Sequence, residues 1–292
     1  MASSNSLNPG HSPSGHVNYN GRLFPSDAPL LSANNRGFRY GDGLFETMLV
    51  KKDGIRLAVY HFDRLLAGMR FLLFDIPPTF TERLTREIFQ LCEANDHFAT
   101  GAARVRLVVF RGDGSPAGPL DTSPHYLIQS WSLPPDPGFN EQGLKLGLFP
   151  DARKASGDPL SNIKSNNYLL YSLASAYAGR QGWDDCLVLN TLDRVADSSI
   201  ANLFYARDGV LYTPPLSEGG VAGVMRRHLL DLLPQAGYPV HERAATVEHL
   251  LEADEIFLTN ALKPLRWVRS LQGRLYESRL SALVYEQLVK SL

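Results

Sequence analysis

The chain has 292 residues, which at about 150 residues per domain predicts two domains. Its 29 Lys and Arg residues nearly balance its 30 Asp and Glu residues, and this net charge of −1 argues against nucleic acid as the main partner, because proteins that bind a phosphate backbone usually carry a basic excess. Hydrophobic residues make up 44% and charged residues 20%, so the composition is that of a globular chain with a large core and excludes a disordered one.

The chain contains no run of 18 apolar residues, and we expect no transmembrane helix and no membrane partner. Residues 1–16 are polar and lack the apolar segment of a signal peptide, so we expect a disordered arm there. Cys92 and Cys186 lie in apolar periodic runs and are expected to be buried thiols, which makes the cytoplasm the default compartment. The histidines are scattered without ligand spacing, so no metal site is expected.

In the first block, short strands alternate with turns and two helices. An Asn-Gly pair inside an alternating run predicts a hairpin near the start, and apolar residues at helical spacing follow later. The expected strands are 16–24, 40–50, 55–60, 103–110 and 126–131, and the expected helices are 61–74 and one that begins near Thr79. Thr79 and Glu82 have the spacing of a capping box.

A proline-rich stretch at 133–138 is the expected linker, because proline stiffens the chain. It divides a small N-terminal α+β domain at 17–132 from a larger C-terminal domain at 139–292. In the second block the expected strands are 144–149, 185–189, 202–205, 210–212 and 255–258, and the expected helices are 165–179 and 223–233. Strands outnumber helices and hairpins are frequent, which favours an α+β fold over a doubly wound parallel sheet.

Several common catalytic motifs are missing from the sequence. It has no GxGxxG, no P-loop, no HExxH and no GxSxG between a strand and a helix. These absences argue against dinucleotide-binding, nucleotide-triphosphate-binding, zinc-protease and α/β-hydrolase functions.

Six short motifs occur instead, in a fixed order along the chain. They are YGDGLFET at 40–47, HFDRL at 61–65, SNIKSNNY at 161–168, RVADSSIANLF at 194–204, GGVAGVMR at 219–226 and DEIFLTN at 254–260. This series resembles the class IV aminotransferases, which are fold-type IV pyridoxal phosphate (PLP) enzymes and include branched-chain and D-amino-acid aminotransferases and aminodeoxychorismate lyase. The resemblance covers roughly residues 17–275 and implies a two-domain D-amino-acid aminotransferase-like fold, with the active site at the domain boundary of a homodimer.

The resemblance also implies which residues handle the cofactor PLP. Lys164 stands at the position of the lysine that forms the Schiff base and later carries a proton. Asp197 stands where the family has a Glu that keeps the pyridine nitrogen protonated, on a side chain one methylene shorter. The alternative for Asp197 is a plain turn residue.

For the phosphate group, the resemblance implies a guanidinium and the N-terminus of a helix. Arg64 would supply the guanidinium, unless it is an ordinary surface arginine. Gly223, Val224 and Met225 would open the helix whose N–H groups bind the phosphate. Ala261 stands where many relatives have a Ser or Thr, so one hydroxyl contact is expected to be missing.

Tyr168 aligns with a tyrosine that hydrogen-bonds the phenolate oxygen of PLP, and packing in the core is its alternative role. Asn202 and Thr259 are expected to be structural supports. The spacing from Lys164 to Asn167 resembles the D-amino-acid aminotransferase and lyase branches, and the runs at 220–226 and 260–264 are most similar to the lyase.

The run RGDGSPAG at 111–118 matches neither branch, so the resemblance assigns no residues to the substrate carboxylate. Chemistry alone gives candidates for the substrate pocket: Tyr40, Phe45, Arg104, Arg106 and Arg111. Arg104 and Arg106 alternate with core residues and share one strand face.

Three hypotheses follow for the function. The first is a PLP-dependent aminotransferase that moves an amino group between an amino acid or amine and a 2-keto acid through Lys164. The second is 4-amino-4-deoxychorismate lyase, which would use the same lysine and release pyruvate and 4-aminobenzoate. The third is a non-catalytic protein of the same fold, suggested by Asp197 and Ala261.

Overall fold

The structure is a computed structural model and describes residues 15–115, 117–134, 138–290 and 292. The described residues form two compact units, each with its own sheet. Unit 1 runs to residue 134 and also includes Lys164–Asn167, and unit 2 takes residues 138–163 and those from Tyr168 onward. The arm expected at 1–16 lies outside the described residues up to residue 14, as do residues 135–137 of the expected linker.

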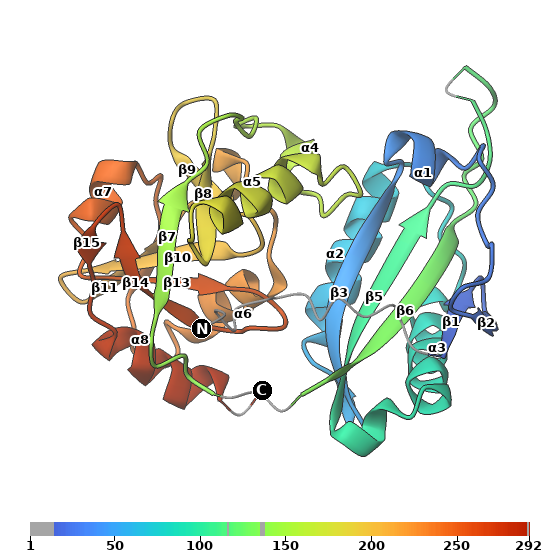
Figure 1. Cartoon of the computed structure of the whole chain (residues 1–292), viewed down its shortest axis with the longest axis horizontal. Coiled ribbons are helices and arrows are strands. Elements are labelled where there is room, and N and C mark those ends of the chain that lie inside the picture. Colours follow the sequence, from blue (N-terminus) through green and yellow to red (C-terminus); the bar gives the residue numbers. More distant parts are fainter. Residues whose placement is uncertain (1–14, 116, 135–137, 291) are drawn as a thin grey trace. The chain divides into compact units, whose positions relative to one another are not determined.

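Within the described residues, unit 1 contains a six-stranded antiparallel sheet in the order β2-β1-β6-β5-β3-β4 (Figure 1). Its elements are β1 (His16–Tyr19), β2 (Arg22–Pro25), α1 (Arg36–Tyr40), β3 (Gly43–Lys51), β4 (Gly54–Ile55), α2 (Ala58–Phe71), α3 (Phe80–Ala94), a 3₁₀ turn (His97–Thr100), β5 (Ala102–Phe110) and β6 (His125–Leu133). The expected hairpin near the start is confirmed as β1 and β2, with Asn20-Gly21 between them.

The two faces of this sheet follow from the alternation of side chains along its strands. Val105 and Leu107 of β5 are fully buried, and Met48 of β3 lies opposite Val105 on the same face. Helices α2 and α3 cover this face, and Figure 1 shows α2 behind β3. The other face carries the half-buried Arg104 and Arg106, which confirms that these two arginines share a face.

The segment Lys164–Asn167 pairs with the first residues of β3. The Phe45 N–H donates to the Lys164 carbonyl at 2.9 Å, and the Asn166 N–H donates to the Gly43 carbonyl at 2.9 Å. Leu44 and Ser165 form an antiparallel bridge. The segment thus pairs as a short strand with the start of β3, on the side where β4 pairs with its end.

Three local predictions in the sequence were wrong. Thr79 precedes α3 with φ 54° and ψ 27°, in the left-handed region, and its side chain makes no cap hydrogen bond, so the capping box with Glu82 does not form. The strand expected at 55–60 ends at Ile55, because α2 begins at Ala58. The helix expected from residue 165 begins at Leu169, because the preceding residues pair with β3 instead.

Within the described residues, unit 2 contains a nine-stranded sheet. Eight strands follow the order β12-β11-β10-β13-β14-β7-β8-β9, and the ninth, β15, pairs with β14. The strands are β7 (Leu144–Leu148), β8 (Asp185–Leu189), β9 (Val195–Ser198), β10 (Asn202–Arg207), β11 (Val210–Thr213), β12 (Val240–Glu242), β13 (Glu255–Thr259), β14 (Arg266–Leu271) and β15 (Arg274–Leu275). The helices are α4 (Pro159–Asn162), α5 (Leu169–Arg180), α6 (Val224–Leu232), α7 (Val247–Leu251) and α8 (Arg279–Val284), with a 3₁₀ turn (Leu216–Glu218) and a π-helical turn (Tyr285–Val289). Antiparallel pairs predominate, and the mixed α+β prediction is confirmed.

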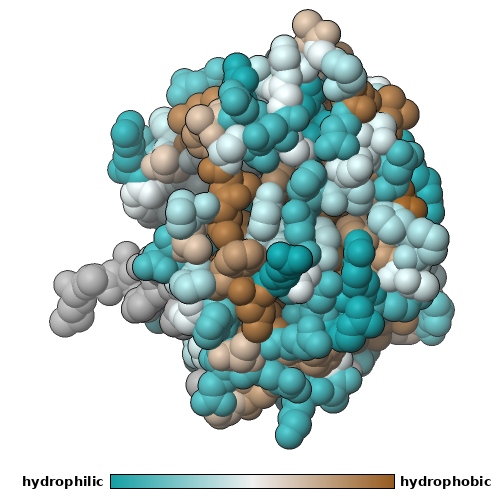
Figure 2. Space-filling view, turned by 90° about the vertical axis from the view of Figure 1, so that its right-hand side faces the viewer, coloured by the Kyte–Doolittle hydropathy of each residue, from teal (hydrophilic) through white to brown (hydrophobic). Residues whose placement is uncertain are grey.

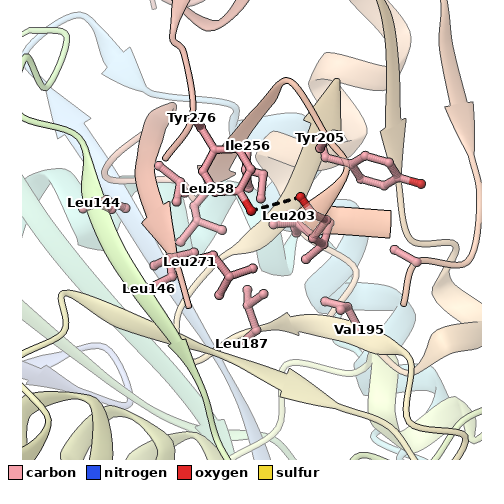
Figure 3. Packing of buried hydrophobic residues seen from close by; sticks show 14 of the residues in the cluster. Leu144, Leu146, Leu187, Val195, Leu203, Tyr205, Ile256, Leu258, Leu271 and Tyr276 are labelled. Carbon is pink, nitrogen blue, oxygen red and sulfur yellow. Dashed lines mark hydrogen bonds between the residues drawn. The ribbon is translucent and has the colours of Figure 1, made fainter. Parts of the chain in front are cut away.

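A hydrophobic cluster forms the centre of unit 2 (Figure 3). Leu146 and Leu187 from neighbouring parallel strands meet Leu203 and Leu258 from an antiparallel pair. Tyr276 closes the cluster, and its hydroxyl donates to the Leu250 carbonyl at 3.0 Å. This core holds β8, β9 and β10, the strands that carry the polar residues of the site described below.

No helix in the described part of the chain combines the length and apolar character needed to cross a membrane. On the face drawn in Figure 2, hydrophobic side chains lie in separate patches among hydrophilic ones. Both cysteines are buried and free of disulfides, as the sequence predicts.

Candidate active site

Lys164 lies beside Phe45, on the face of the unit 1 sheet that carries Arg106. Its Nζ is 4.2 Å from the centre of the Phe45 ring, and the guanidinium carbon of Arg106 is 3.9 Å from the same centre. Phe45 is 3% exposed, so one buried ring holds two cations in place. A lysine amine beside an arginine is a suitable setting for a nucleophilic amine that handles an anionic substrate.

Two glycines of the YGDGLFET motif allow the lysine segment to approach β3. Gly41 has φ +66°, and an added Cβ would lie 3.4 Å from the Asn167 nitrogen. At Gly43 a Cβ would collide with the Val109 carbonyl oxygen and lie 2.7 Å from Asn166 Nδ2. A side chain at Gly43 would therefore displace the segment that carries Lys164, whereas Gly41 is required for its left-handed backbone conformation.

The other substrate-pocket candidates have different surroundings. Arg111 is 3% exposed, and its guanidinium bonds Asp42, the Asp121 carbonyl at 2.8 Å and the Leu72 carbonyl. Arg104 stacks 5.1 Å from the Trp131 ring centre. Tyr40 is 43% exposed at the end of α1. Arg111 therefore braces the fold, while Arg106 is the arginine placed beside Lys164.

Arg64 on α2 forms a two-pronged ion pair with Glu46 of β3. Its Nε donates to Oε1 at 2.8 Å and one terminal nitrogen donates to Oε2 at 2.6 Å, while His61 Nδ1 lies 2.6 Å from Oε2. Burial alone would raise the pKa of Glu46, but the charges and hydrogen bonds of Arg64 and His61 outweigh it and hold this pKa at about 2. Arg64 is thus a fixed cation, not a mobile surface arginine.

In unit 2, Asp197 of β9 is buried with one carboxylate oxygen engaged and one without a partner. Its Oδ2 accepts from the Tyr171 hydroxyl at 2.7 Å and from the Val221 N–H at 3.0 Å. Its Oδ1 has no hydrogen-bond partner among the described residues. Burial raises the pKa of Asp197 to about 6, against the opposing charge of Lys154. A buried acceptor that lacks a donor is rare and points to a ligand.

The glycine-rich loop before α6 is tied down by two asparagines. Asn162 Nδ2 donates to the Leu216 carbonyl at 2.8 Å and to the Gly220 carbonyl at 2.7 Å. Asn202 Nδ2 donates to the Val221 carbonyl at 2.8 Å, and a Cβ at Gly223 would collide with Asn202 Oδ1. Asn202 is therefore a structural support of the loop, as the sequence predicts.

Helix α6 begins where the sequence predicts it, with Gly223 as its N-cap and Val224 and Met225 as its first residues. The first N–H groups of a helix have no partner within it and form a ready site for an anion. Ala261 follows β13 in a turn closed by Asn260, which accepts from the Lys263 N–H at 2.8 Å.

Tyr168 packs in a hydrophobic cluster with Tyr171, and the two ring centres are 4.8 Å apart. Its hydroxyl donates to the Ser199 carbonyl at 3.1 Å. The Thr259 hydroxyl is buried without a hydrogen-bond partner among the described residues, so the supporting role expected for Thr259 stays a prediction.

Sequence reasoning missed Glu46, Tyr171 and Asn162, and two of them carried a visible signal. Glu46 shares its strand face with Leu44 and Met48, and a carboxylate on a buried strand face needs a cationic partner. Tyr171 follows Tyr168 by three residues and shares its helix face. No sequence signal indicated Asn162, because the two carbonyls to which it donates lie more than 50 residues away in the chain.

The sequence model described as "Amino-transferase class IV" matches residues 43–271, more than half of the chain. The chain belongs to the class IV aminotransferase family. The fold and family predicted from the six motifs are therefore confirmed.

Relatives within this family include both transaminases and lyases. The chain is 31% identical over 233 residues to an aminodeoxychorismate lyase of Vibrio harveyi, covering 78% of this chain and 82% of the lyase. It is 26% identical over 285 residues to a branched-chain-amino-acid aminotransferase of Pseudomonas aeruginosa, covering 95% and 91%. The crystal structure of a branched-chain aminotransferase from Thermoproteus uzoniensis matches the fold with a TM-score of 0.83 at 23% identity, covering 95% of each chain.

Class IV aminotransferases are PLP enzymes. The residues present here fit that cofactor at two points. The unpartnered Asp197 Oδ1 is an acceptor suited to a protonated ring nitrogen, and the N-terminus of α6 suits a phosphate.

Proposed function

We propose that this class IV aminotransferase is a PLP-dependent transaminase that moves an amino group between an amino acid or amine and a 2-keto acid. The observation that carries the proposal is the buried Asp197 carboxylate, whose Oδ1 lacks a donor while its Oδ2 is fixed by two. A buried anion with one oxygen left open is costly unless a cationic group pairs with it. A protonated pyridine nitrogen is such a group.

The chain's own residues divide the work of this reaction. PLP supplies an electron sink when it is bound. Asp197 Oδ1 would accept the hydrogen bond of the ring nitrogen, and the N–H groups of Val224 and Met225 would bind the phosphate. Lys164 Nζ would hold the cofactor in the resting enzyme, and once the amino donor has displaced it, the free amine would remove the proton from Cα of the donor. Arg106, which shares the Phe45 ring with Lys164, binds the substrate carboxylate.

The remaining roles are assigned by family resemblance. Arg64, fixed by Glu46, adds positive charge for the phosphate. The Tyr168 hydroxyl binds the phenolate oxygen of PLP, which requires its proton to turn away from the Ser199 carbonyl. Ala261 contributes a backbone N–H in place of a hydroxyl. We also propose that the protein acts as a homodimer in the cytoplasm.

A second candidate is aminodeoxychorismate lyase, favoured by the 31% identity to the Vibrio harveyi enzyme. The same lysine and carboxylate would serve, with pyruvate as a product. The two activities differ in one measurable requirement, because a lyase needs no keto acid acceptor.

The first test is the near-UV and visible absorption spectrum of the purified protein with PLP, before and after L- and D-amino acids are added without acceptor. For a transaminase we expect a band of bound cofactor that one set of donors converts to the pyridoxamine form. Lys164→Ala is expected to abolish turnover, a loss of at least about 1,000-fold, because no other group replaces the amine. The matched control is Lys145→Ala, since Lys145 is exposed on β7.

Each outcome of this test has a definite meaning. A band that no donor shifts, together with pyruvate release from aminodeoxychorismate, selects the lyase. Failure of the wild-type chain to retain PLP rules out both enzymes and leaves the non-catalytic protein of the same fold. Wild-type turnover by Lys164→Ala rejects the assignment of the lysine.

A further inference from the structure

Asp197 lies in a setting that works against its own negative charge. It is 2% exposed, and Asp185 on the neighbouring strand β8 adds a second buried carboxylate nearby. Asp185 is itself satisfied, because it accepts from the Ser198 hydroxyl at 2.7 Å and the Ser199 hydroxyl at 2.6 Å. The Asp197 carboxylate therefore depends on its other neighbours to stay ionised.

The positive charge near Asp197 comes from Lys154, which follows β7. The backbone of Lys154 is pinned, since its N–H donates to the Leu189 carbonyl at 2.9 Å and its carbonyl accepts from the Thr191 N–H at 2.9 Å. The other end is pinned as well, because Nζ donates to the Ser161 carbonyl at 2.9 Å. A lysine held at both ends is a fixed charge.

Tyr171 connects this fixed charge to the carboxylate. Lys154 Nζ lies 5.0 Å from the centre of the Tyr171 ring, within the range of a cation–π contact. The hydroxyl of the same ring donates to Asp197 Oδ2 at 2.7 Å. A cation over the ring strengthens the phenol as a hydrogen-bond donor, so the contacts favour the charged carboxylate in two ways.

We propose that Lys154 is a positioning residue that keeps the Asp197 carboxylate charged and oriented for the ring nitrogen of PLP, directly through its charge and through the Tyr171 phenol. The proposal rests on the proposed function, because it assigns PLP to this carboxylate. The groups that face Asp197 are Lys154 from the segment after β7, Tyr171 from α5 and Asp185 from β8. Asp158 is a further charge beside Lys154.

The rival role for Lys154 is that of a brace for the Ser161 carbonyl. The two roles predict different pH dependences of PLP affinity. Loss of a brace weakens binding by the same factor at every pH. Loss of the charge raises the pKa of Asp197 above its present value of about 6, so binding weakens relative to the wild type near neutral pH and the difference disappears in alkali.

The experiment measures the Kd for PLP of the full-length, cofactor-depleted chain by intrinsic fluorescence between pH 5 and 9. For Lys154→Met we expect the midpoint of the pH dependence to move up by at least about one unit, and the Kd at pH 7 to rise between about twofold and tenfold. Lys154→Arg keeps the charge and should restore the wild-type profile. Lys145→Met is the matched control, the same change at an exposed lysine.

Tyr171→Phe provides a second route to the answer if Lys154→Met does not fold. It keeps the ring and removes the hydroxyl that donates to Asp197, so it should move the midpoint in the same direction. If the Kd of Lys154→Met has the same midpoint in its pH dependence as the wild type, the proposal is overturned, whether or not binding is weaker. The proposed function is then left intact. If the wild-type chain does not bind PLP at all, the proposed function fails first.

Discussion

Asp197 has a buried carboxylate whose pKa is raised to about 6, and this links cofactor chemistry to stability. A carboxyl group with a pKa of 3.8 in the unfolded chain binds its proton more tightly in the folded one, so the stability it contributes is present below pH 4 and is lost as the pH rises to about 6. The difference of about two units corresponds to roughly 3 kcal/mol. The folded protein therefore carries this cost at neutral pH unless PLP pairs with the carboxylate.

Asp197→Asn removes this titration. In the cofactor-depleted protein, we expect the loss of unfolding free energy between pH 4 and pH 6 to be about 3 kcal/mol smaller than in the wild type. Urea unfolding at several pH values measures the effect. Asp208→Asn is the control, because the Asp208 side chain is 92% exposed. An unchanged slope in Asp197→Asn would show that this carboxyl does not titrate in the folded state between pH 4 and 6.

At the scale of elements, the phosphate site proposed at the start of α6 depends on Gly223, the N-cap residue of this helix. Gly223 has an ordinary φ of −68°, so its role is steric: a Cβ there would collide with Asn202 Oδ1. We expect Gly223→Ala to weaken binding of PLP about tenfold while affecting pyridoxal, which lacks the phosphate, much less, because the displaced N–H groups are those proposed to bind the phosphate. Titrations of the two compounds measure the difference.

Gly179→Ala is the control for this glycine, since no atom lies within 4 Å of the added Cβ in helix α5. It should leave PLP affinity unchanged and stabilise the protein by roughly 0.5–1 kcal/mol. Equal losses of PLP and pyridoxal affinity in Gly223→Ala would contradict a role in phosphate binding.

Most strands and long helices were predictable because their signals are local. Periodicity placed β5, β8 and α6 within a residue or two, since each buries one regular face. The predicted helix began at Ser165, but Ser165 and Asn166 pair with β3, more than a hundred residues away. Thr79 has the capping-box sequence and lacks its backbone conformation. Neither the strand pairing of the first segment nor the left-handed backbone conformation of Thr79 can be read from a local sequence pattern, because both depend on the tertiary structure.

The candidate site was predictable residue by residue and not as a set of contacts. The motifs gave Lys164 and Asp197, but the partners that set their chemistry are Phe45, Tyr171 and Lys154, which come from other elements. The charge balance of a buried site depends on such long-range neighbours, which no local spacing reports.

At the scale of the whole molecule, each unit contains a buried carboxylate, and the two have pKa values shifted in opposite directions. Glu46 in unit 1 has a pKa lowered from 4.5 to about 2, so it contributes roughly 3 kcal/mol that is present above pH 4.5 and is lost as the pH falls toward 2. Asp197 in unit 2 does the reverse, because its folded pKa is raised, and its contribution to the stability of unit 2 grows as the pH falls from about 6 to 4.

Each unit has its own sheet and core, so these opposing shifts should separate their unfolding transitions in acid. We expect calorimetry of the cofactor-depleted chain to resolve two transitions near pH 3, with unit 1 melting first. Glu46→Gln should lower the unit 1 transition at pH 7 by on the order of 10 °C, and Glu93→Gln, on the exposed side of α3, should not. The contrary outcome is a single transition at pH 3 whose midpoint temperature shifts in both Glu46→Gln and Asp197→Asn. The two units would then unfold as one cooperative block, and Glu46 and Asp197 would both contribute to the one free energy of unfolding.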